Sequence, residues 1–253
     1  MRADIIGCLA CPVCGEPLAE GGGALRCGLR HAFDIAHQGY VNLLPGDASP
    51  GTADTPAMVA ARAAFLGRGH FSAIADAVAE AAEEALADGA PGCIAEVGAG
   101  TGYYLAAVLD RLPARLGLAL DISKAAAKRA AHAHERAGAI VCDAWERLPV
   151  RDGAAALVLD IFAPRNATEF ARVLAPGGAL VVVTPTQRHL EEIVGPLGMI
   201  AVDAEKDRRV AEQLAGVFEL SGSIAVEERM SLDRDDVLAV AGMGPSAWHA
   251  GED

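Results

Sequence analysis

The chain has 253 residues, of which 52% are hydrophobic and 22% are charged, a composition that is typical of a globular protein and excludes intrinsic disorder. It contains no apolar run of about 18 residues and no signal-peptide core, which predicts a cytoplasmic protein with no membrane association. The net charge of −13 argues against a polyanionic partner such as nucleic acid. However, residues 200–253 carry 5 basic and 12 acidic side chains, so much of the acidity lies at one end of the chain.

Composition divides the chain into three parts. Residues 1–44 are rich in cysteine, glycine and proline and predict a small domain of short strands and turns. Residues 45–56 contain three prolines and two glycines among small polar residues, which is typical of a linker. Residues 57–253 are expected to form a second domain.

In the second domain the pattern first predicts two helices, at 57–69 and 72–88. Short apolar runs and helical segments then alternate. This alternation predicts an α/β fold with a Rossmann-like, mostly parallel sheet that is covered by helices on both faces. The strands are expected at 93–98, 116–121, 139–143, 154–160 and 179–185, and the helices between them at 102–112, 123–137 and 166–174.

Four side chains near the N-terminus have the spacing of metal ligands. Cys11 and Cys14 form a Cys-x2-Cys pair, and Cys27 and His31 follow as a Cys-x3-His pair. Three thiolates and one imidazole satisfy tetrahedral Zn²⁺ and leave no open position for catalysis, so we expect one structural zinc ion per chain. Such an ion would stabilise a unit that is too small for an adequate apolar core.

The spacing leaves alternatives to this ligand set. Cys8 also forms a Cys-x2-Cys pair with Cys11, although we expect it to be a packing residue. His37 could replace His31 as the fourth ligand. Buried free cysteines without any metal are the remaining interpretation.

A glycine-rich turn follows the first expected strand of the second domain. The segment 96–102, EVGAGTG, has the spacing GxGxG, and Tyr103 stands where the dinucleotide-binding pattern GxGxxG requires glycine. Glycine permits a sharp turn and a close approach of a ligand to the backbone. S-adenosylmethionine has no phosphate, so the shorter pattern suits this cofactor better than a dinucleotide. Glu96 is then expected to face the cationic amino-acid end of the cofactor.

Two aspartates end the next two expected strands. Asp121 is expected to accept hydrogen bonds from ribose hydroxyls, and Asp143 from the adenine amino group. A strand-end aspartate can also be an ordinary helix cap, so each position alone is a weak signal. Together with the glycine turn, the two aspartates predict a nucleoside-binding site.

Longer segments carry a resemblance to one protein family. Besides the cysteine motif and EVGAGTGYY (96–104), these segments are FDIAHQGYVNLLP (33–45), MVAARAAFLGRGHF (58–71), LDISKAAAKRAA (120–131), FAPRN (162–166), LAPGGALVVVTP (174–185) and MGPSAWH (243–249). Over nearly its whole length the chain resembles the RlmA-type 23S rRNA (guanine-N1)-methyltransferases. Within that family it is most similar to the branch associated with resistance to tylosin-like macrolides.

The resemblance implies a class I S-adenosylmethionine-dependent methyltransferase domain joined to an N-terminal zinc ribbon. It also implies a guanine in hairpin 35 of 23S rRNA as substrate, and a homodimer whose ribbons and catalytic domains form one RNA cleft. Phe71 lies where some members have a cofactor-contacting tyrosine, so a hydroxyl contact is absent there. The other residues that match family positions are the zinc ligands Cys11, Cys14, Cys27 and His31 and the cofactor contacts Gly98, Gly100, Thr101, Gly102, Tyr103 and His189.

Residues 160–166 are the expected substrate wall, because they follow a strand beside the cofactor site. Phe162 could stack on the guanine, Pro164 fixes the turn, and Arg165 could hold a phosphate or O6. Asp160 is the nearest candidate for a base that removes the N1 proton. An ordinary strand-end aspartate is the alternative for that position.

Four arginines are the candidate RNA contacts: Arg26 and Arg30 in the ribbon, and Arg62 and Arg68 in the first helices. We expect them to face one cleft, with the acidic end of the chain turned away from it. The chain stops a few residues after MGPSAWH, where related chains usually run on into an antiparallel strand. Either the protein is naturally short or its sheet ends with an exposed edge.

Two other functions are compatible with the same motifs. A small-molecule methyltransferase agrees with the acidic charge but has no evident use for a zinc ribbon. A non-catalytic RNA- or protein-binding module would use the ribbon and carry a vestigial cofactor fold. The intact glycine turn, Asp121 and Asp143 argue against the second alternative.

Overall fold

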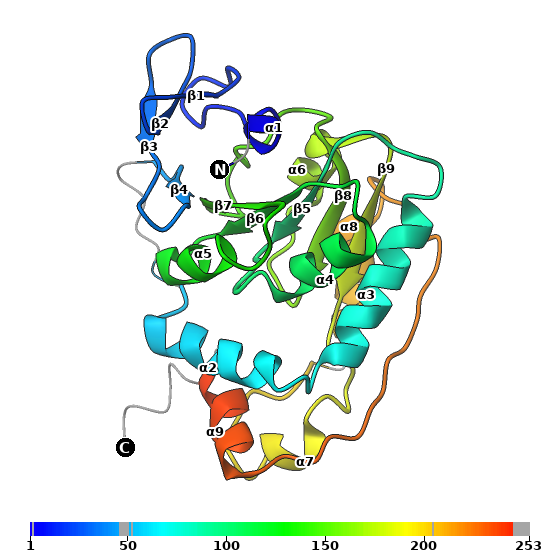
Figure 1. Ribbon diagram of the computed structural model, residues 1–253. Helices are drawn as coiled ribbons and strands as arrows, with labels where there is room; N and C mark the ends of the chain where they lie inside the picture. The colour runs from blue at the N-terminus through cyan, green and yellow to red at the C-terminus, as the bar shows by residue number, and fades with distance from the viewer. Residues whose placement is uncertain (2, 46–50, 52, 204, 245–253) are drawn as a thin grey trace.

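The structure, a computed structural model, describes residues 1–253 except 2, 46–50, 52, 204 and 245–253, so parts of the expected linker and of MGPSAWH lie outside the described residues. Its centre is a six-stranded sheet in the order β4-β7-β6-β5-β8-β9, in which neighbouring strands run parallel (Figure 1). The strands are β4 (Val41–Asn42), β5 (Cys93–Val97), β6 (Gly117–Asp121), β7 (Ala137–Val141), β8 (Ala155–Ile161) and β9 (Leu174–Val183).

Helices cover both faces of this sheet because its strands are apolar on both sides. Every residue of β5 and β8 is buried. The helices α3 (Ser72–Ala85), α4 (Tyr103–Arg111) and α5 (Lys124–Ala130) pack on one face in a single apolar cluster (Figure 1). The short helix α1 (Ala3–Ile6) and the helix α6 (Ala167–Val173) pack on the opposite face. The expected α/β class is confirmed.

The remaining helices are α2 (Pro56–Gly67), α7 (Glu191–Val194), α8 (Lys206–Leu214) and α9 (Arg234–Gly242). In Figure 1, α2 and α9 lie together at the end of the sheet that is opposite the blue N-terminal strands. Their contact is apolar and includes the fully buried Phe65 of α2. No helix in the described part of the chain is long and apolar enough to cross a membrane.

The N-terminal part contains an antiparallel three-stranded sheet. It is formed by β1 (Ala19–Gly21), β2 (Ala24–Arg26) and β3 (Ala32–Asp34). Glycines at positive φ allow the tight β1–β2 turn, at Gly22 and Gly23. These strands form the frame of the expected ribbon.

The N-terminal part and the large sheet share one apolar core. The buried side chains of Ile5, Leu9 and Leu25 belong to the same cluster as buried residues of β5, β6, β7 and β8. A Cβ atom at Gly138 of β7 would lie 2.8 Å from Cγ2 of Ile5, so glycine at this position permits the close approach of α1. In addition, β4 pairs with β7, with Val41 opposite Ile140. The domain boundaries, 1–44 and 57–253, stay a prediction. The two parts nevertheless pack against each other through a shared apolar core.

Two elements differ most from the expected ranges. The helix expected at 123–137 was predicted too long, because it ends at Ala130 and the chain must turn before Ala137 pairs with Gly117. The strand expected at 179–185 begins earlier, at Leu174. This early start requires Gly178, where a Cβ atom would lie 2.9 Å from a backbone oxygen. In the described residues β9 is the last strand of the sheet, paired with β8 alone.

Candidate functional site

The four expected metal ligands lie together in the ribbon. The donor atoms of Cys11, Cys14, Cys27 and His31 are all within 4.8 Å of one another. Nδ1 of His31 lies 3.3 Å from Sγ of Cys27 and 3.5 Å from Sγ of Cys11. Cys11 and Cys14 are held in a tight turn that closes with the N–H of Gly15 donating to the carbonyl of Cys11 at 2.8 Å. This closed set of three thiols and one imidazole fits structural Zn²⁺.

The alternative ligands lie elsewhere. Cys8 packs against Cys93 of β5, whose thiol forms a side-chain hydrogen bond with that of Cys8. His37 is exposed and is not part of the four-residue cluster. The geometry therefore favours Cys11 over Cys8 and His31 over His37.

A cavity of about 760 Å³ lies at the carboxyl ends of β5, β6, β7 and β8. This is the end of a parallel sheet where ligands bind, beside the point at which the strand order reverses between β5 and β8. The cavity volume is in the range of small-molecule sites. Its outer walls come from α2, α9 and the segment between β9 and α8. The expected site residues that line it are Phe71, Glu96, Gly98, Gly100, Thr101, Tyr103, Asp121, Asp143, Phe162, Pro164 and His189.

The glycines of the 96–102 turn are required mainly by protein packing. Gly98, Gly100 and Gly102 all have positive φ. A Cβ atom at Gly98 would lie 2.5 Å from Cβ of Ala163, and one at Gly102 would lie 2.9 Å from Cβ of Ala133. Gly102 does not line the cavity but precedes α4 as its N-cap residue. The turn thus brings the 162–166 segment against β5, which was not foreseen from the sequence.

Glu96 lies at the bottom of the cavity and is 1% exposed. Its Oε2 atom accepts a hydrogen bond from the backbone N–H of Leu105 at 3.1 Å. Burial raises the pKa of Glu96 to about 8, against the lowering effect of this hydrogen bond. A cationic group in the cavity would stabilise the ionised form, as expected for the amino-acid end of S-adenosylmethionine.

Asp121 and Asp143 are held by backbone hydrogen bonds. Asp121 accepts from the N–H of Gly100 at 2.7 Å and from the N–H of Ser123 at 2.8 Å. Burial raises the pKa of Asp121, and these two hydrogen bonds oppose that effect. Asp143 accepts from the N–H of Trp145 at 2.9 Å. Carboxylates and apolar walls fit a cationic nucleoside, whereas a pyrophosphate would be repelled by Asp121.

Three aromatic rings, those of Phe71, Phe162 and His189, form an aromatic wall of the cavity. The ring centroids of Phe71 and Phe162 each lie 5.7 Å from that of His189, and 6.5 Å from each other. Phe162 has a φ of 54°, an unfavourable value for a residue with a Cβ atom, and its side chain is 39% exposed. Burial lowers the pKa of His189, so its ring is largely neutral at pH 7. The strained backbone at Phe162 presents a flat apolar ring to the cavity.

Asp160 is buried beside this wall and does not itself line the cavity. Its Oδ1 atom lies 3.3 Å from Nε of Arg165, and neither carboxylate oxygen has a hydrogen-bond partner among the described residues. Burial raises the pKa of Asp160 to about 7, although Arg165 and Lys206 favour its ionised form. The guanidinium of Arg165 is thus directed inward, towards Asp160. The roles of Asp160 as base and of Arg165 as a substrate contact stay predictions.

The four candidate RNA-binding arginines fall into two groups. Arg26 and Arg30 are exposed on the ribbon. Arg62 instead lines the cavity and forms an ion pair with Asp54, while Arg68 pairs with two carboxylates of the acidic C-terminal part. The acidic α9 therefore packs against α2 and is not turned away from the site, contrary to our expectation.

Comparison with known proteins agrees with this geometry. Residues 9–48 match the family described as "RlmA, N-terminal", a zinc ribbon, and residues 94–178 match a methyltransferase domain. The chain is 48% identical over 253 residues to the 23S rRNA (guanine(748)-N(1))-methyltransferase of Streptomyces fradiae, covering 100% of this chain and 90% of that protein. The chain belongs to the 23S rRNA (guanine-N1)-methyltransferase family. A member from Micromonospora griseorubida, named provisionally for this activity, is 51% identical over 98% of this chain and 90% of that protein.

A more distant member of the (guanine-N1)-methyltransferase family comes from Bacillus subtilis (strain 168) and is also named provisionally. It is 29% identical over 96% of this chain and 88% of its own length. The family assignment confirms the resemblance seen in the sequence. It also confirms the expected fold, an S-adenosylmethionine-dependent methyltransferase domain joined to a zinc ribbon.

Two cavity residues of this (guanine-N1)-methyltransferase were missed in the sequence. Trp145 lies two residues after Asp143 and is 64% exposed at the cavity rim. It could have been noticed as one of only two tryptophans in the chain. Lys206 begins α8 and reaches the cavity from a polar segment that has no distinguishing pattern. Only the folded chain brings it near Asp160.

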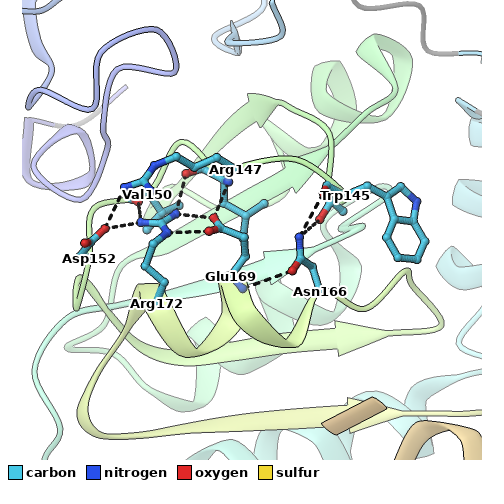
Figure 2. A network of polar contacts seen from close by, with 9 residues as sticks. Trp145, Arg147, Val150, Asp152, Asn166, Glu169 and Arg172 are labelled. Carbon is cyan, nitrogen blue, oxygen red and sulfur yellow. Dashed lines mark hydrogen bonds and ion pairs between the residues drawn. The ribbon is translucent and has the colours of Figure 1, made fainter. Parts of the chain in front are cut away.

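The loop that carries Trp145 is fastened to α6 by a polar network (Figure 2). The side-chain amide of Asn166 donates to the carbonyl of Trp145 at 3.2 Å. Arg172 donates to Glu169 at 2.8 Å and 2.5 Å and to Asp152 at 2.5 Å. Figure 2 shows that these side chains span the loop between β7 and β8 and the first turns of α6. The network fixes the rim of the cavity.

Proposed function

We propose that this protein transfers a methyl group from S-adenosylmethionine to N1 of a guanine in hairpin 35 of 23S rRNA. The observation that supports this most strongly is the full-length similarity to a methyltransferase named for guanine 748 of 23S rRNA. The association of a zinc ribbon with a nucleoside-sized cavity in one core agrees with it. Resistance to tylosin-type macrolides and a cytoplasmic location follow as part of the same proposal.

Bound S-adenosylmethionine would supply an activated methyl group on a positively charged sulfur atom. Asp121 and Asp143 would accept hydrogen bonds from its ribose and adenine, and Glu96 would face its amino-acid end. These three carboxylates all line the cavity. They would hold the methyl group at one end of a site that the aromatic wall closes at the other.

The guanine must be unpaired to react, because N1 lies on its Watson–Crick edge. Phe162 would stack on the flipped base, and the rings of Phe71 and His189 lie next to that of Phe162. Burial of the base excludes water, and stacking orients N1 towards the methyl group. Asp160 and Arg165 lie next to this position, and their role is considered below.

Recognition of the hairpin is proposed to involve the ribbon. Arg26 and Arg30 are exposed there, and Arg30 sits in a turn at a φ of 69°. Because these are few cations, we expect shape and stacking to contribute more to RNA binding than bulk charge does. A homodimer would place two ribbons and two cavities around one hairpin.

The first prediction is that the purified protein methylates a hairpin-35 transcript with radiolabelled S-adenosylmethionine. Reverse transcriptase should stop at the modified guanine, because an N1 methyl group blocks base pairing.

Asp121→Ala should abolish labelling through loss of cofactor affinity, whereas Arg26→Glu with Arg30→Glu should weaken RNA binding and leave cofactor affinity unchanged. Label that enters only small molecules of a cell extract would contradict the proposal and favour a small-molecule methyltransferase. No measurable cofactor binding would favour a non-catalytic module.

A further inference from the structure

A buried group of charges lies at the edge of the cavity and is not explained by cofactor binding. Asp160 ends β8 with 0% exposure, and the side chain of Arg165 is 11% exposed. Both oxygens of Asp160 and Nε of Arg165 lack hydrogen-bond partners among the described residues. Buried polar atoms without partners are rare in proteins, so their presence indicates a place where a further group is bound or held.

Lys206 is a third charged residue near this pair, and it is only partly buried. It lines the cavity, and the charges of Asp160 and Arg165 influence its pKa in opposite directions. Burial and the charge of Arg165 lower the pKa of Lys206, while the carboxylates of Asp207, Asp160 and Asp203 favour its charged form. The described residues that line the cavity include one other full cation, Arg62, and that side chain already pairs with Asp54.

Lys206 lines the same cavity as Phe162 and His189 of the aromatic wall. A planar group stacked on Phe162 would therefore have a positive charge beside its edge. Guanine becomes such a planar anion when N1 loses its proton, because the negative charge is shared between N1 and O6. The site thus combines stacking with a cation that is suited to this anion.

We infer that Lys206 contacts O6 of the bound guanine and stabilises the N1 anion, while the Asp160–Arg165 pair positions Lys206. In this step the N1–H bond breaks and the proton passes to a water molecule. The electron pair stays on the guanine and is then available to form the bond to the methyl carbon. Lys206 keeps its own proton throughout, and Asp160 acts as a positioning residue. This inference rests on the proposed function.

The test compares Lys206→Met with wild type and with Lys128→Met, a matched substitution of an exposed lysine of α5. Wild-type methylation of the hairpin must be established first, so that failure of the function and failure of the inference are distinguishable. Lys206→Met is expected to lower kcat by about 100-fold, as for the loss of one oxyanion-stabilising donor. It should leave the affinity for S-adenosylmethionine, measured by calorimetry, unchanged. Lys128→Met should behave as wild type.

The pH profile separates this role from a merely structural one. Without the cation the N1 proton is held more tightly, so kcat of Lys206→Met should go on rising with pH where the wild-type rate has levelled off. Lys206→Arg should restore the wild-type profile in part because it keeps the charge. Asp160→Asn should make the rate fall at high pH, because Lys206 beside Arg165 would lose its proton more readily. An unchanged kcat and profile in Lys206→Met would overturn the inference.

A second measurement does not depend on turnover or on the folding of a variant. Addition of the hairpin transcript to the wild-type protein should protect Lys206, but not Lys128, from an amine-acylating reagent, as read by peptide mass spectrometry. Equal acylation of Lys206 with and without RNA would overturn the inference. A loss of cofactor affinity in Lys206→Met would also overturn it and place the lysine at the cofactor instead.

Discussion

The thiols of Cys8 and Cys93 meet where the chain leaves α1 and touches β5. A hydrogen bond from Cys93 lowers the pKa of Cys8 to about 7, against the effect of burial, and the charge of Arg151 contributes to this lowering. Cys93 is buried, whereas Cys8 is partly exposed. Cys8 is therefore a packing residue, as expected, but it is also a reactive one.

We predict that Cys8 is alkylated by iodoacetamide with half-maximal rate near pH 7. The rate should fall as pH drops below this value, because the thiolate becomes protonated. In Cys93→Ala the pKa should return towards the ordinary value near 8.5, so the labelling of Cys8 at pH 7 should fall by roughly tenfold. Peptide mass spectrometry distinguishes Cys8 from the zinc ligands, and the buried Cys142 is an unreactive control. A Cys8 rate unaffected by Cys93→Ala would contradict the assigned hydrogen bond.

At the scale of single elements, the side-chain amide of Asn166 holds together the start of α6 and the loop before β8. Oδ1 of Asn166 accepts from the N–H of Glu169 at 3.3 Å and caps α6. Its Nδ2 atom donates to the carbonyls of Ala144 and Trp145 at 3.3 Å and 3.2 Å (Figure 2). One side chain thus joins a helix start to the rim of the cavity.

Asn166→Ala should lower the free energy of unfolding by about 1–2 kcal/mol, because both the cap and the loop contacts are lost. The affinity for S-adenosylmethionine should fall several-fold, since Trp145 is no longer held at the rim. Asn166→Asp keeps the cap and loses the donors, so it should recover most of the stability and little of the affinity. Urea unfolding and calorimetry measure the two effects. If the two variants behave alike in both measurements, the helix cap and the loop contacts do not make separate contributions to stability and affinity, contrary to this prediction.

At the scale of the whole molecule, the ribbon is part of the structural core of the protein. Buried side chains of the ribbon and of the sheet form one cluster, and β4 extends the sheet from the ribbon side. The zinc ligands Cys11 and Cys27 are themselves buried in this cluster. Loss of the metal should therefore destabilise the catalytic part as well.

We predict that the protein contains one zinc ion per chain by elemental analysis. Its removal by a chelator, or Cys14→Ser, should lower the Tm of a single cooperative transition by roughly 10 °C, because metal binding contributes directly to folding. His31→Ala should have a similar effect, whereas His37→Ala should have none. A catalytic part that melts at an unchanged temperature without zinc would contradict the shared core. Protein purified without chelator that holds no zinc would contradict the metal site.

The sequence determined the features that depend on neighbouring residues. The period of apolar residues predicted the parallel α/β sheet because strand and helix patterns are local, and the predicted elements shifted at their ends, as at Ala130 and Leu174. The strand β4 and the helices α7, α8 and α9 were not predicted. The spacing of the four ligands predicted the metal cluster for the same reason, since each pair lies on one tight turn. The GxGxG turn and the strand-end carboxylates lie together at the carboxyl ends of the strands, as predicted.

The tertiary structure decided what depends on contacts between distant parts of the chain. Only folding showed that Gly98 makes room for Ala163, that Arg68 pairs with α9 and is not free for RNA, and that the ribbon shares the core of the sheet. It also brought Lys206 close enough to Asp160 for their charges to interact, although no local pattern marks either residue as a partner of the other. The net charge of −13 argued against a nucleic-acid partner, but a sum over the chain is a poor guide to binding. Electrostatic energy depends on where the charges lie and how far they are desolvated. The sequence therefore specifies the elements and the ligand turns, and packing decides which charges meet in the site.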